Sequence, residues 1–225
     1  MSGVFITFEG ADGSGKSSVL KRIIPELKSM QEREVIVTRE PGGSVIAEKI
    51  RNIILDPTHM EMDVRTEALL YAASRRQHVV ETIMPALEAG KIVVSDRFVD
   101  SSLVYQGVGR NIGIDEVAEI NAFATEGLIP DLTLYLDVDA QTGLDRIRLN
   151  REVAETDRLD NETINFHQKV NNGYQKLLKR YPDRIDRVDA TAPLDSVVAD
   201  CLTILKDFLA QREENEDEIT NKYRK

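Results

Sequence analysis

Residues 10–17 carry the clearest chemical signal in the sequence. They read GADGSGKS and fit the pattern G-x-x-x-x-G-K-[ST], a phosphate-binding loop (P-loop) when a strand precedes it and a helix follows it. Glycines let backbone amides fold closely around phosphate oxygens, and the helix N-terminus adds partial positive charge. We expect Lys16 to reach the β- and γ-phosphates of a nucleotide and Ser17 to bind Mg²⁺. The residues expected to hold the nucleotide are Gly10, Ala11, Asp12, Gly13, Ser14, Gly15, Lys16, Ser17 and Ser18.

A P-loop alone does not separate a kinase from a nucleotide-dependent switch or motor. The glycine spacing does not match G-x-G-x-x-G, which disfavours a nicotinamide enzyme. The choice therefore depends on the residues that would face a second substrate.

Charged pairs follow two other apolar runs that read as strands. Asp96 and Arg97 follow one of them, and Arg39 and Glu40 follow another. Residues just beyond the carboxyl ends of parallel strands line the ligand crevice. Asp96 suits Mg²⁺ and Arg97 suits a bidentate phosphate contact, with a local ion pair as the alternative. Arg51, one helix further on, is either a third phosphate ligand or a solvated helix residue.

Two further segments carry groups that could bind a nucleoside. Tyr71 and Arg75 are four residues apart and share one helix face, so a ring could stack on a base while a guanidinium contacts its edge. The alternative is an ordinary cation–π pair on an amphipathic helix. Ser102, Tyr105 and Gln106 follow the Asp-Arg pair and add hydroxyl and amide groups, with a polar helix start as the alternative.

The rest of the chain alternates short β-branched runs with amphipathic helices. Strands are expected at 4–8, 35–38, 92–94 and 132–136, with a weaker candidate at 185–188. Helices are expected after the P-loop, where Pro25 should bend the helix or shift its register, and at 64–89 and 194–210. This alternation requires right-handed crossovers and a parallel sheet covered on both faces, which is an α/β fold.

Length and composition limit the class of protein. The chain has 225 residues, the size of one domain, and 29 basic against 39 acidic residues give a net charge of −10. That charge argues against a protein that coats nucleic acid or an anionic membrane. The single cysteine, Cys201, is expected to be buried, and three scattered histidines give no zinc spacing. With no basic leader at its start and no membrane-length apolar run, the protein is expected to be cytoplasmic.

Taken together and in order, the motifs resemble those of bacterial thymidylate kinases. They lie at 8–17, 38–43, 72–75, 96–98, 101–106 and 157–158, and the resemblance covers about residues 3–210. It implies a P-loop nucleoside-monophosphate kinase fold, with a five-stranded parallel sheet flanked by helices and a mobile lid. It also implies MgATP-dependent phosphorylation of dTMP to dTDP by a homodimer.

The resemblance implies roles for the residues around the phosphates. Asp12 would lie near the 3′-hydroxyl of the acceptor sugar, and Asp96 near the metal. Arg97, together with Arg39 or Arg51, would hold the acceptor phosphate. Because that acceptor is already an anion, positioning and charge neutralisation can carry the step without a strong base.

The resemblance also implies a base and sugar site. Tyr71 would stack on thymine, Arg75 and Gln106 would read its edge, and Tyr105 would crowd the 2′ position against ribose. Glu40 would support the site around the metal and the phosphate-binding arginine. The full set of expected substrate-binding residues is Glu40, Arg39, Arg51, Tyr71, Arg75, Arg97, Ser102, Tyr105 and Gln106.

A cation for the transferring phosphoryl group must come from outside this P-loop. Some thymidylate kinases carry that arginine inside the loop, and this sequence does not. Residues 146–158 hold four arginines and little apolar content, so we expect them to form the lid. Arg151 is the first candidate and Arg158 the second. The expected catalytic residues are Lys16, Asp12, Arg97, Arg151 and Arg158.

Residues 1–210 are thus expected to form a single P-loop kinase domain. Residues 211–225 are expected to be a charged tail, either frayed helix or disordered. Two other functions stay open at this point. One is a P-loop kinase for a deoxynucleoside or another monophosphate, which the number of arginines disfavours. The other is a nucleotide-dependent switch.

Overall fold

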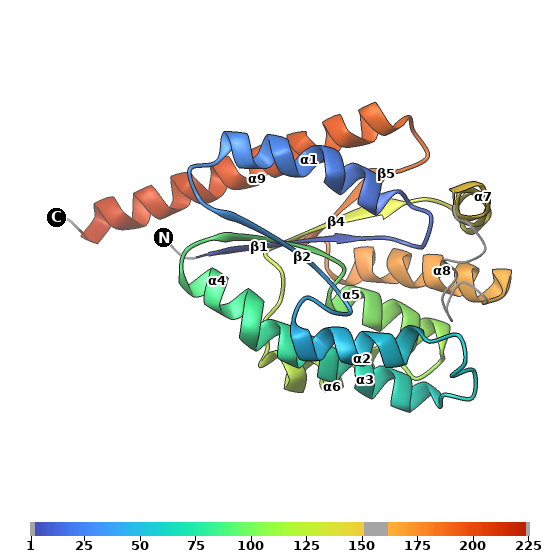
Figure 1. Ribbon diagram of the computed structural model, residues 1–225. Helices are drawn as coiled ribbons and strands as arrows, with labels where there is room; N and C mark the ends of the chain where they lie inside the picture. Colours follow the sequence, from blue (N-terminus) through green and yellow to red (C-terminus); the bar gives the residue numbers. More distant parts are fainter. Residues whose placement is uncertain (1–2, 151–161, 224–225) are drawn as a thin grey trace.

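A five-stranded parallel sheet forms the centre of the computed structural model, which describes residues 3–150 and 162–223 (Figure 1). Its strands are β1 (Val4–Glu9), β2 (Val35–Arg39), β3 (Ile92–Asp96), β4 (Leu132–Asp137) and β5 (Ile185–Asp189), in the order β2-β3-β1-β4-β5. The α/β fold and the five predicted strands are confirmed. β1 and β3, which carry the P-loop and the Asp-Arg pair at their carboxyl ends, are neighbours.

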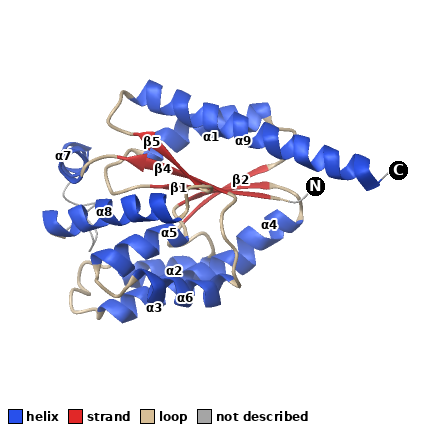
Figure 2. Ribbon diagram, turned by 180° about the vertical axis from the view of Figure 1, so that it is seen from behind, coloured by secondary structure: helices blue, strands red, loops and turns tan. Residues whose placement is uncertain are grey.

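Helices cover both faces of this sheet. They are α1 (Lys16–Met30), α2 (Val45–Leu55), α3 (Val64–His78), α4 (Met84–Glu88), α5 (Val99–Ser102), α6 (Ile114–Thr125), α7 (Ala140–Asn150), α8 (Ile164–Arg180) and α9 (Leu194–Tyr223), with π-helical segments η1 (Val79–Ile83) and η2 (Leu103–Gly109). Figures 1 and 2 show α1 and α9 on one side of the sheet, with α2, α3, α6 and α8 on the other.

The alternation of side chains along β1 explains these two layers. Val4, Ile6 and Phe8 pack against α1 and α9 in the largest apolar cluster. Phe5 packs on the opposite face with η1 and α4. Glu9 also faces this second side, where it accepts hydrogen bonds from residues that follow β3. Because side chains alternate along a strand, β1 contributes apolar residues to the core on one face and the Glu9 carboxylate on the other.

Two helical predictions differ in detail from the structure. The helix expected at 64–89 is interrupted by the π-helical segment η1, a type of insertion that apolar periodicity does not reveal. The helix expected at 194–210 continues to Tyr223, and Arg212 within it forms an ion pair with Asp131 at 2.5 Å. Pro25 lies inside α1, the helix that follows the P-loop. Within the described ranges, no helix is long and apolar enough to cross a membrane.

Candidate active site

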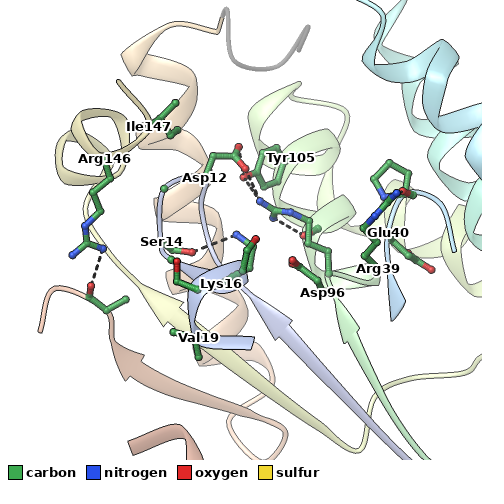
Figure 3. A pocket seen from close by; sticks show the side chains of 18 of the residues that line it. Asp12, Ser14, Lys16, Val19, Arg39, Glu40, Asp96, Tyr105, Arg146 and Ile147 are labelled. Atoms are coloured by element: carbon green, nitrogen blue, oxygen red, sulfur yellow. Dashed lines mark hydrogen bonds and ion pairs between the residues drawn. The ribbon is translucent and has the colours of Figure 1, made fainter. Parts of the chain in front are cut away.

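The P-loop connects β1 to α1 and opens into a cavity of about 640 Å³ (Figure 3). Gly13 and Gly15 adopt positive φ angles of 76° and 90°, a conformation that glycine reaches without steric cost. At Gly13, a Cβ atom would lie 2.0 Å from the carbonyl oxygen of Gly143 in α7. The loop therefore requires glycine here for its conformation and for the close approach of α7.

Lys16 is buried at the start of α1 and folds back onto the P-loop, as Figure 3 shows. Its Nζ donates to the carbonyl oxygens of Gly10 at 2.9 Å and Ala11 at 3.1 Å, and to Ser14 Oγ at 3.3 Å. Burial and the nearby Arg97 guanidinium lower the pKa of Lys16 to about 8. The ammonium is thus held within the loop that would receive phosphate.

Arg97 joins the end of β3 to the P-loop. Its Nη2 donates to Asp12 Oδ1 at 2.6 Å, and Tyr105 Oη donates to the other Asp12 oxygen at 2.8 Å. Burial raises the pKa of Asp12, but the positive charges of Arg97 and Lys16 and the hydrogen bond from Tyr105 together outweigh burial, so that pKa lies below its usual value. Arg97 has a φ of 72°, a strained conformation for a non-glycine residue, which places the guanidinium between the two segments.

A buried carboxylate, Glu9, lies beneath Arg97. It accepts from Phe98 N at 2.8 Å, from Ser101 Oγ at 2.6 Å and from Tyr174 Oη at 2.9 Å. Arg97 Nη1 in turn donates to Ser101 Oγ at 3.0 Å. Burial, with the negative charge of Asp100, raises the pKa of Glu9 to about 6. Glu9 therefore supports Arg97 through a shared hydroxyl.

Arg75 is almost completely buried on the other side of the site and is bonded to four groups. Its Nε donates to Glu40 Oε2 at 2.7 Å and its Nη2 donates to the carbonyl oxygen of Phe98 at 2.9 Å. Nη1 donates to Ser102 Oγ at 3.0 Å and also to Asn121. The other Glu40 oxygen is bonded to His78 Nδ1 at 2.9 Å. Glu40 thus contacts the arginine expected at the base, whereas the resemblance implied support around Arg97.

Arg39 and Arg51 meet at one carbonyl group. Arg39 Nη1 and Arg51 Nη1 donate to the Pro41 oxygen at 2.9 and 2.8 Å. Arg39 is half exposed and also pairs with Glu48 at 3.1 Å. Both arginines line the cavity, so the structure brings together the two residues that the resemblance left as alternatives.

Asp96 has the features of a cation ligand. Its Oδ1 is buried, and within the described part of the chain it has no hydrogen-bond partner. Ser17 lines the same cavity. Carboxylate and hydroxyl oxygens are hard donors of the kind that Mg²⁺ prefers. The donor set therefore fits the predicted metal.

The cavity brings together most of the residues predicted to bind substrates. Its lining includes Asp12, Gly13, Ser14, Gly15, Lys16, Ser17, Ser18, Arg39, Glu40, Arg51, Tyr71, Arg75, Asp96, Arg97, Ser102, Tyr105 and Gln106. Arg151 and Arg158 lie outside the described residues. Arg146, considered only as part of the lid segment, lines the cavity opposite Arg39 and donates to the carbonyl oxygen of Ala190 at 2.9 Å (Figure 3).

Sequence reasoning did not identify Glu9, Ser101, His78 or Tyr174 as parts of the site. Glu9 and Ser101 belong to motifs on which the resemblance rests, so their position next to predicted site residues could have identified them. No local pattern marks Tyr174, which reaches Glu9 from α8, 165 residues along the chain.

Comparison with known proteins decides the family. A family model described as thymidylate kinase matches residues 8–201. The chain belongs to the thymidylate kinase family. It is 60% identical over 198 residues to the thymidylate kinase of Enterococcus faecalis, covering 88% of this chain and 93% of that one. It is 56% identical over 205 residues to that of Latilactobacillus sakei, covering 91% and 95%.

A solved structure agrees with this assignment. The crystal structure of thymidylate kinase from Ehrlichia chaffeensis superimposes with a TM-score of 0.73 at 29% identity, covering 92% of this chain and 99% of that one. The enzyme is therefore a nucleoside-monophosphate kinase that phosphorylates dTMP with ATP as the donor. The two alternatives, a P-loop kinase for a deoxynucleoside or another monophosphate and a nucleotide-dependent switch, are set aside.

Proposed function

We propose that ATP and dTMP occupy one continuous cavity, with their reacting phosphates meeting at Arg97. The observation that carries this proposal is the Arg97–Asp12 ion pair, at 2.6 Å, which joins the strand end expected at the acceptor to the P-loop expected at the donor. A guanidinium at this junction can contact both phosphates and neutralise charge as the phosphoryl group moves.

ATP binds with its β- and γ-phosphates in the P-loop. The amides of the loop and the N-terminus of α1 supply partial positive charge. Lys16 exchanges its bonds to the Gly10 and Ala11 carbonyls for bonds to phosphate oxygens. Anionic phosphate then raises the pKa of Lys16 and fixes the ammonium in its charged form.

dTMP binds with its phosphate toward Arg97, Arg39 and Arg51 and its base toward α3 and η2. Tyr71 from α3 and Gln106 from η2 line this part of the cavity. Four of the five N–H donors of Arg75 are engaged by protein acceptors, which leaves one for the O4 edge of thymine. Ser102 positions Arg75 through Nη1, at 3.0 Å.

Asp96 and Ser17 would hold Mg²⁺, and the ion would supply charge neutralisation for the transferring group. Because the acceptor is a phosphate anion, Asp12 is not required as a strong base. Its two oxygens instead fix Arg97 and Tyr105.

The lid and the domain division remain predictions. Residues 1–210 are proposed as the kinase domain and 146–158 as its lid, with Arg151 and then Arg158 as the catalytic cation. Residues 211–225 are proposed to be a charged tail outside the kinase domain, although α9 includes part of them.

We also propose a cytoplasmic homodimer formed through α2, α3 and α6. These three helices are packed side by side and expose large apolar side chains, namely Val45, Ile46, Ile53, Leu69 and Phe123. Phe123→Glu should give a species of 25.3 kDa by light scattering where the unmodified chain gives twice that mass. Leu149→Glu, an equally exposed site on α7, should leave the dimer intact.

An acceptor panel with MgATP tests the proposed site. dTMP should have the highest kcat/KM among dTMP, dUMP, dCMP, dGMP, AMP and thymidine. Thymidine, which lacks the phosphate, should react poorly because the arginines have no anion to hold. Equal kcat/KM values for thymidine and dTMP would show that these arginines do not bind the acceptor phosphate.

A further inference from the structure

A buried carboxylate, Glu67, lies directly behind Gln106. Both side chains are 1% exposed, and Gln106 Nε2 donates to Glu67 Oε1 at 2.9 Å. Glu67 belongs to the first turn of α3 and Gln106 to η2, so the pair joins the two elements expected to hold the base. Glu67 is not among the residues that line the cavity.

Arg110 places a positive charge against both oxygens of this carboxylate. Its Nε and Nη2 donate to the two Glu67 oxygens, each at 3.2 Å. Arg110 is paired on its other side with Glu162, at 2.5 Å, and its guanidinium lies 4.8 Å from the ring centroid of Phe166. A bidentate contact with a guanidinium strongly favours the charged form of a buried carboxyl group.

An ionised carboxylate accepts hydrogen bonds and cannot donate them, so it fixes the orientation of the Gln106 amide. The NH₂ group must face Glu67, and the carbonyl oxygen Oε1 must point away from it. In the part of the chain that the structure describes, no protein N–H or O–H donates to Oε1, and Gln106 lines the cavity. The cavity is therefore offered an acceptor rather than a donor at this position.

Pyrimidine bases differ in whether their ring N3 donates or accepts a hydrogen bond. Thymine and uracil carry a ring N3–H, which donates, whereas cytosine has an unprotonated N3, which accepts. A carbonyl oxygen accepts a hydrogen bond from N3–H of thymine or uracil. Opposite cytosine it faces another acceptor, and no hydrogen bond forms. A site built to hydrogen-bond one group rejects an analogue that lacks it, because its polar atoms are then left unpaired.

We propose that Glu67 is a specificity-positioning residue, which holds the Gln106 amide so that its carbonyl selects bases with an N3–H. The inference rests on the proposed function, in that the base must lie against Gln106. Glu67 itself does not touch the substrate and acts through Gln106.

The test is Glu67→Gln, assayed with dTMP, dUMP and dCMP. A neutral amide at position 67 can donate or accept, so the Gln106 amide is no longer held in one orientation. The kcat/KM values for dTMP and dUMP should fall together by about tenfold or more, mainly through KM, since an unpaired buried polar contact costs about this much. That for dCMP should stay level or rise. The dTMP to dUMP ratio should not change, because those bases differ only by a methyl group.

Glu162→Gln is the matched control. It makes the same chemical change on the other side of Arg110 and leaves the contact between Glu67 and Gln106 in place. Its selectivity among the three acceptors should equal that of the unmodified enzyme. If Glu67→Gln alone does not fold, the same change combined with Arg110→Gln removes the partly buried cation and should give the same loss of selectivity.

A double-mutant cycle with Gln106→Ala separates this inference from the proposed function. In the Gln106→Ala background, Glu67→Gln should no longer alter base choice. Selectivity retained by Gln106→Ala would show that the base does not lie against Gln106, which contradicts the proposed function. Altered selectivity in Gln106→Ala, combined with an equal loss on all three acceptors in Glu67→Gln, would leave the proposed function standing and overturn the positioning role of Glu67.

Discussion

The two halves of the cavity differ in how their polar groups are arranged. In the proposed acceptor half, the side chains expected around the base are buried and bonded to other side chains: Arg75 to Glu40, at the end of β2, and Gln106 of η2 to Glu67 of α3. In the proposed donor half, formed by the P-loop, Lys16 donates to the carbonyl oxygens of Gly10 and Ala11 and to Ser14 Oγ. Arg146, which lines the same cavity, donates to the carbonyl oxygen of Ala190. The hydrogen bonds of the base site are therefore already formed without substrate, whereas Lys16 is expected to exchange its bonds when phosphate binds.

This difference follows from the chemistry of the two ligands. A nucleobase is neutral and is recognised by the placement of donors and acceptors, which is effective only if these are held rigidly. A polyphosphate carries several charges and can draw an ammonium away from carbonyl oxygens that hold it by hydrogen bonds alone. The fixed hydrogen bonds of the acceptor half therefore contribute to the choice of base. Rearrangement of Lys16 in the donor half does not reduce that selectivity.

Removing Arg75 should have the largest effect on stability. Arg75→Ala leaves Glu40 buried without its arginine, and the free energy of unfolding should fall by about 3–5 kcal/mol. Arg76→Ala, at the next position, removes an exposed ion pair with Glu126 and should cost about 0–1 kcal/mol. Urea unfolding measures both. Equal losses would show that the acceptor half is not assembled in the way described.

Removing Lys16 should have the largest effect on catalysis. Lys16→Ala should lower kcat by about 10²–10³-fold, because a preorganised charge at the transferring phosphate is lost. The fold should persist, since the loop backbone is unchanged. Steady-state kinetics with thermal melting checks both points, and Lys21→Ala on the exposed side of α1 is the control. Activity within threefold of the unmodified enzyme would exclude Lys16 from the donor site.

Removing Arg97 should affect the acceptor more than the donor. Arg97→Ala should raise KM for dTMP by about 10²-fold, since a buried charge-assisted contact is lost, with a smaller change in KM for ATP. Arg97→Lys should also be poor because a single ammonium cannot replace a fork that contacts Asp12 and Ser101 together. A change confined to ATP would place Arg97 in the donor half alone.

The smallest expected effect is on the pH profile. Lys16 has its pKa lowered to about 8, so above pH 8 the free enzyme loses the ammonium that would bind phosphate. The value of kcat/KM for ATP should fall about tenfold per pH unit on this alkaline side. The corresponding limb of kcat should lie at higher pH, because bound nucleotide raises the pKa of Lys16. If kcat/KM and kcat fell at the same alkaline pH, bound nucleotide would not raise the pKa of Lys16, and Lys16 would not exchange its carbonyl contacts for phosphate.

Much of this site could be predicted from local patterns. The P-loop and the Asp96–Arg97 pair lie at the carboxyl ends of strands, where a parallel sheet must collect them whatever the rest of the chain does. Buried strands need continuous apolar residues, so β1, β3 and β4 were identified by their apolar runs. β5, in which only Ile185 and Val188 are buried, was the weaker candidate.

The supporting contacts could not be predicted in this way. Glu9 and Tyr174 are 165 residues apart, and Glu67 and Gln106 are 39 apart, and neither pair has a spacing that marks it in the sequence. Their partnership depends on how α8 and α3 pack against the segment that follows β3. The π-helical segments η1 and η2 were missed because they shift the helical register only locally.

The difference between the halves can be measured directly by NMR of the enzyme labelled with ¹⁵N at lysine and arginine side chains. Without substrates, the Arg75 Nε–H signal should be protected from solvent exchange, while Lys16 should titrate with a pKa of about 8. A non-hydrolysable MgATP analogue should raise the Lys16 pKa and leave the Arg75 signal nearly unchanged. If Arg75 exchanged as fast as the exposed Arg76, or Lys16 titrated at its ordinary value before nucleotide was added, the account would be contradicted.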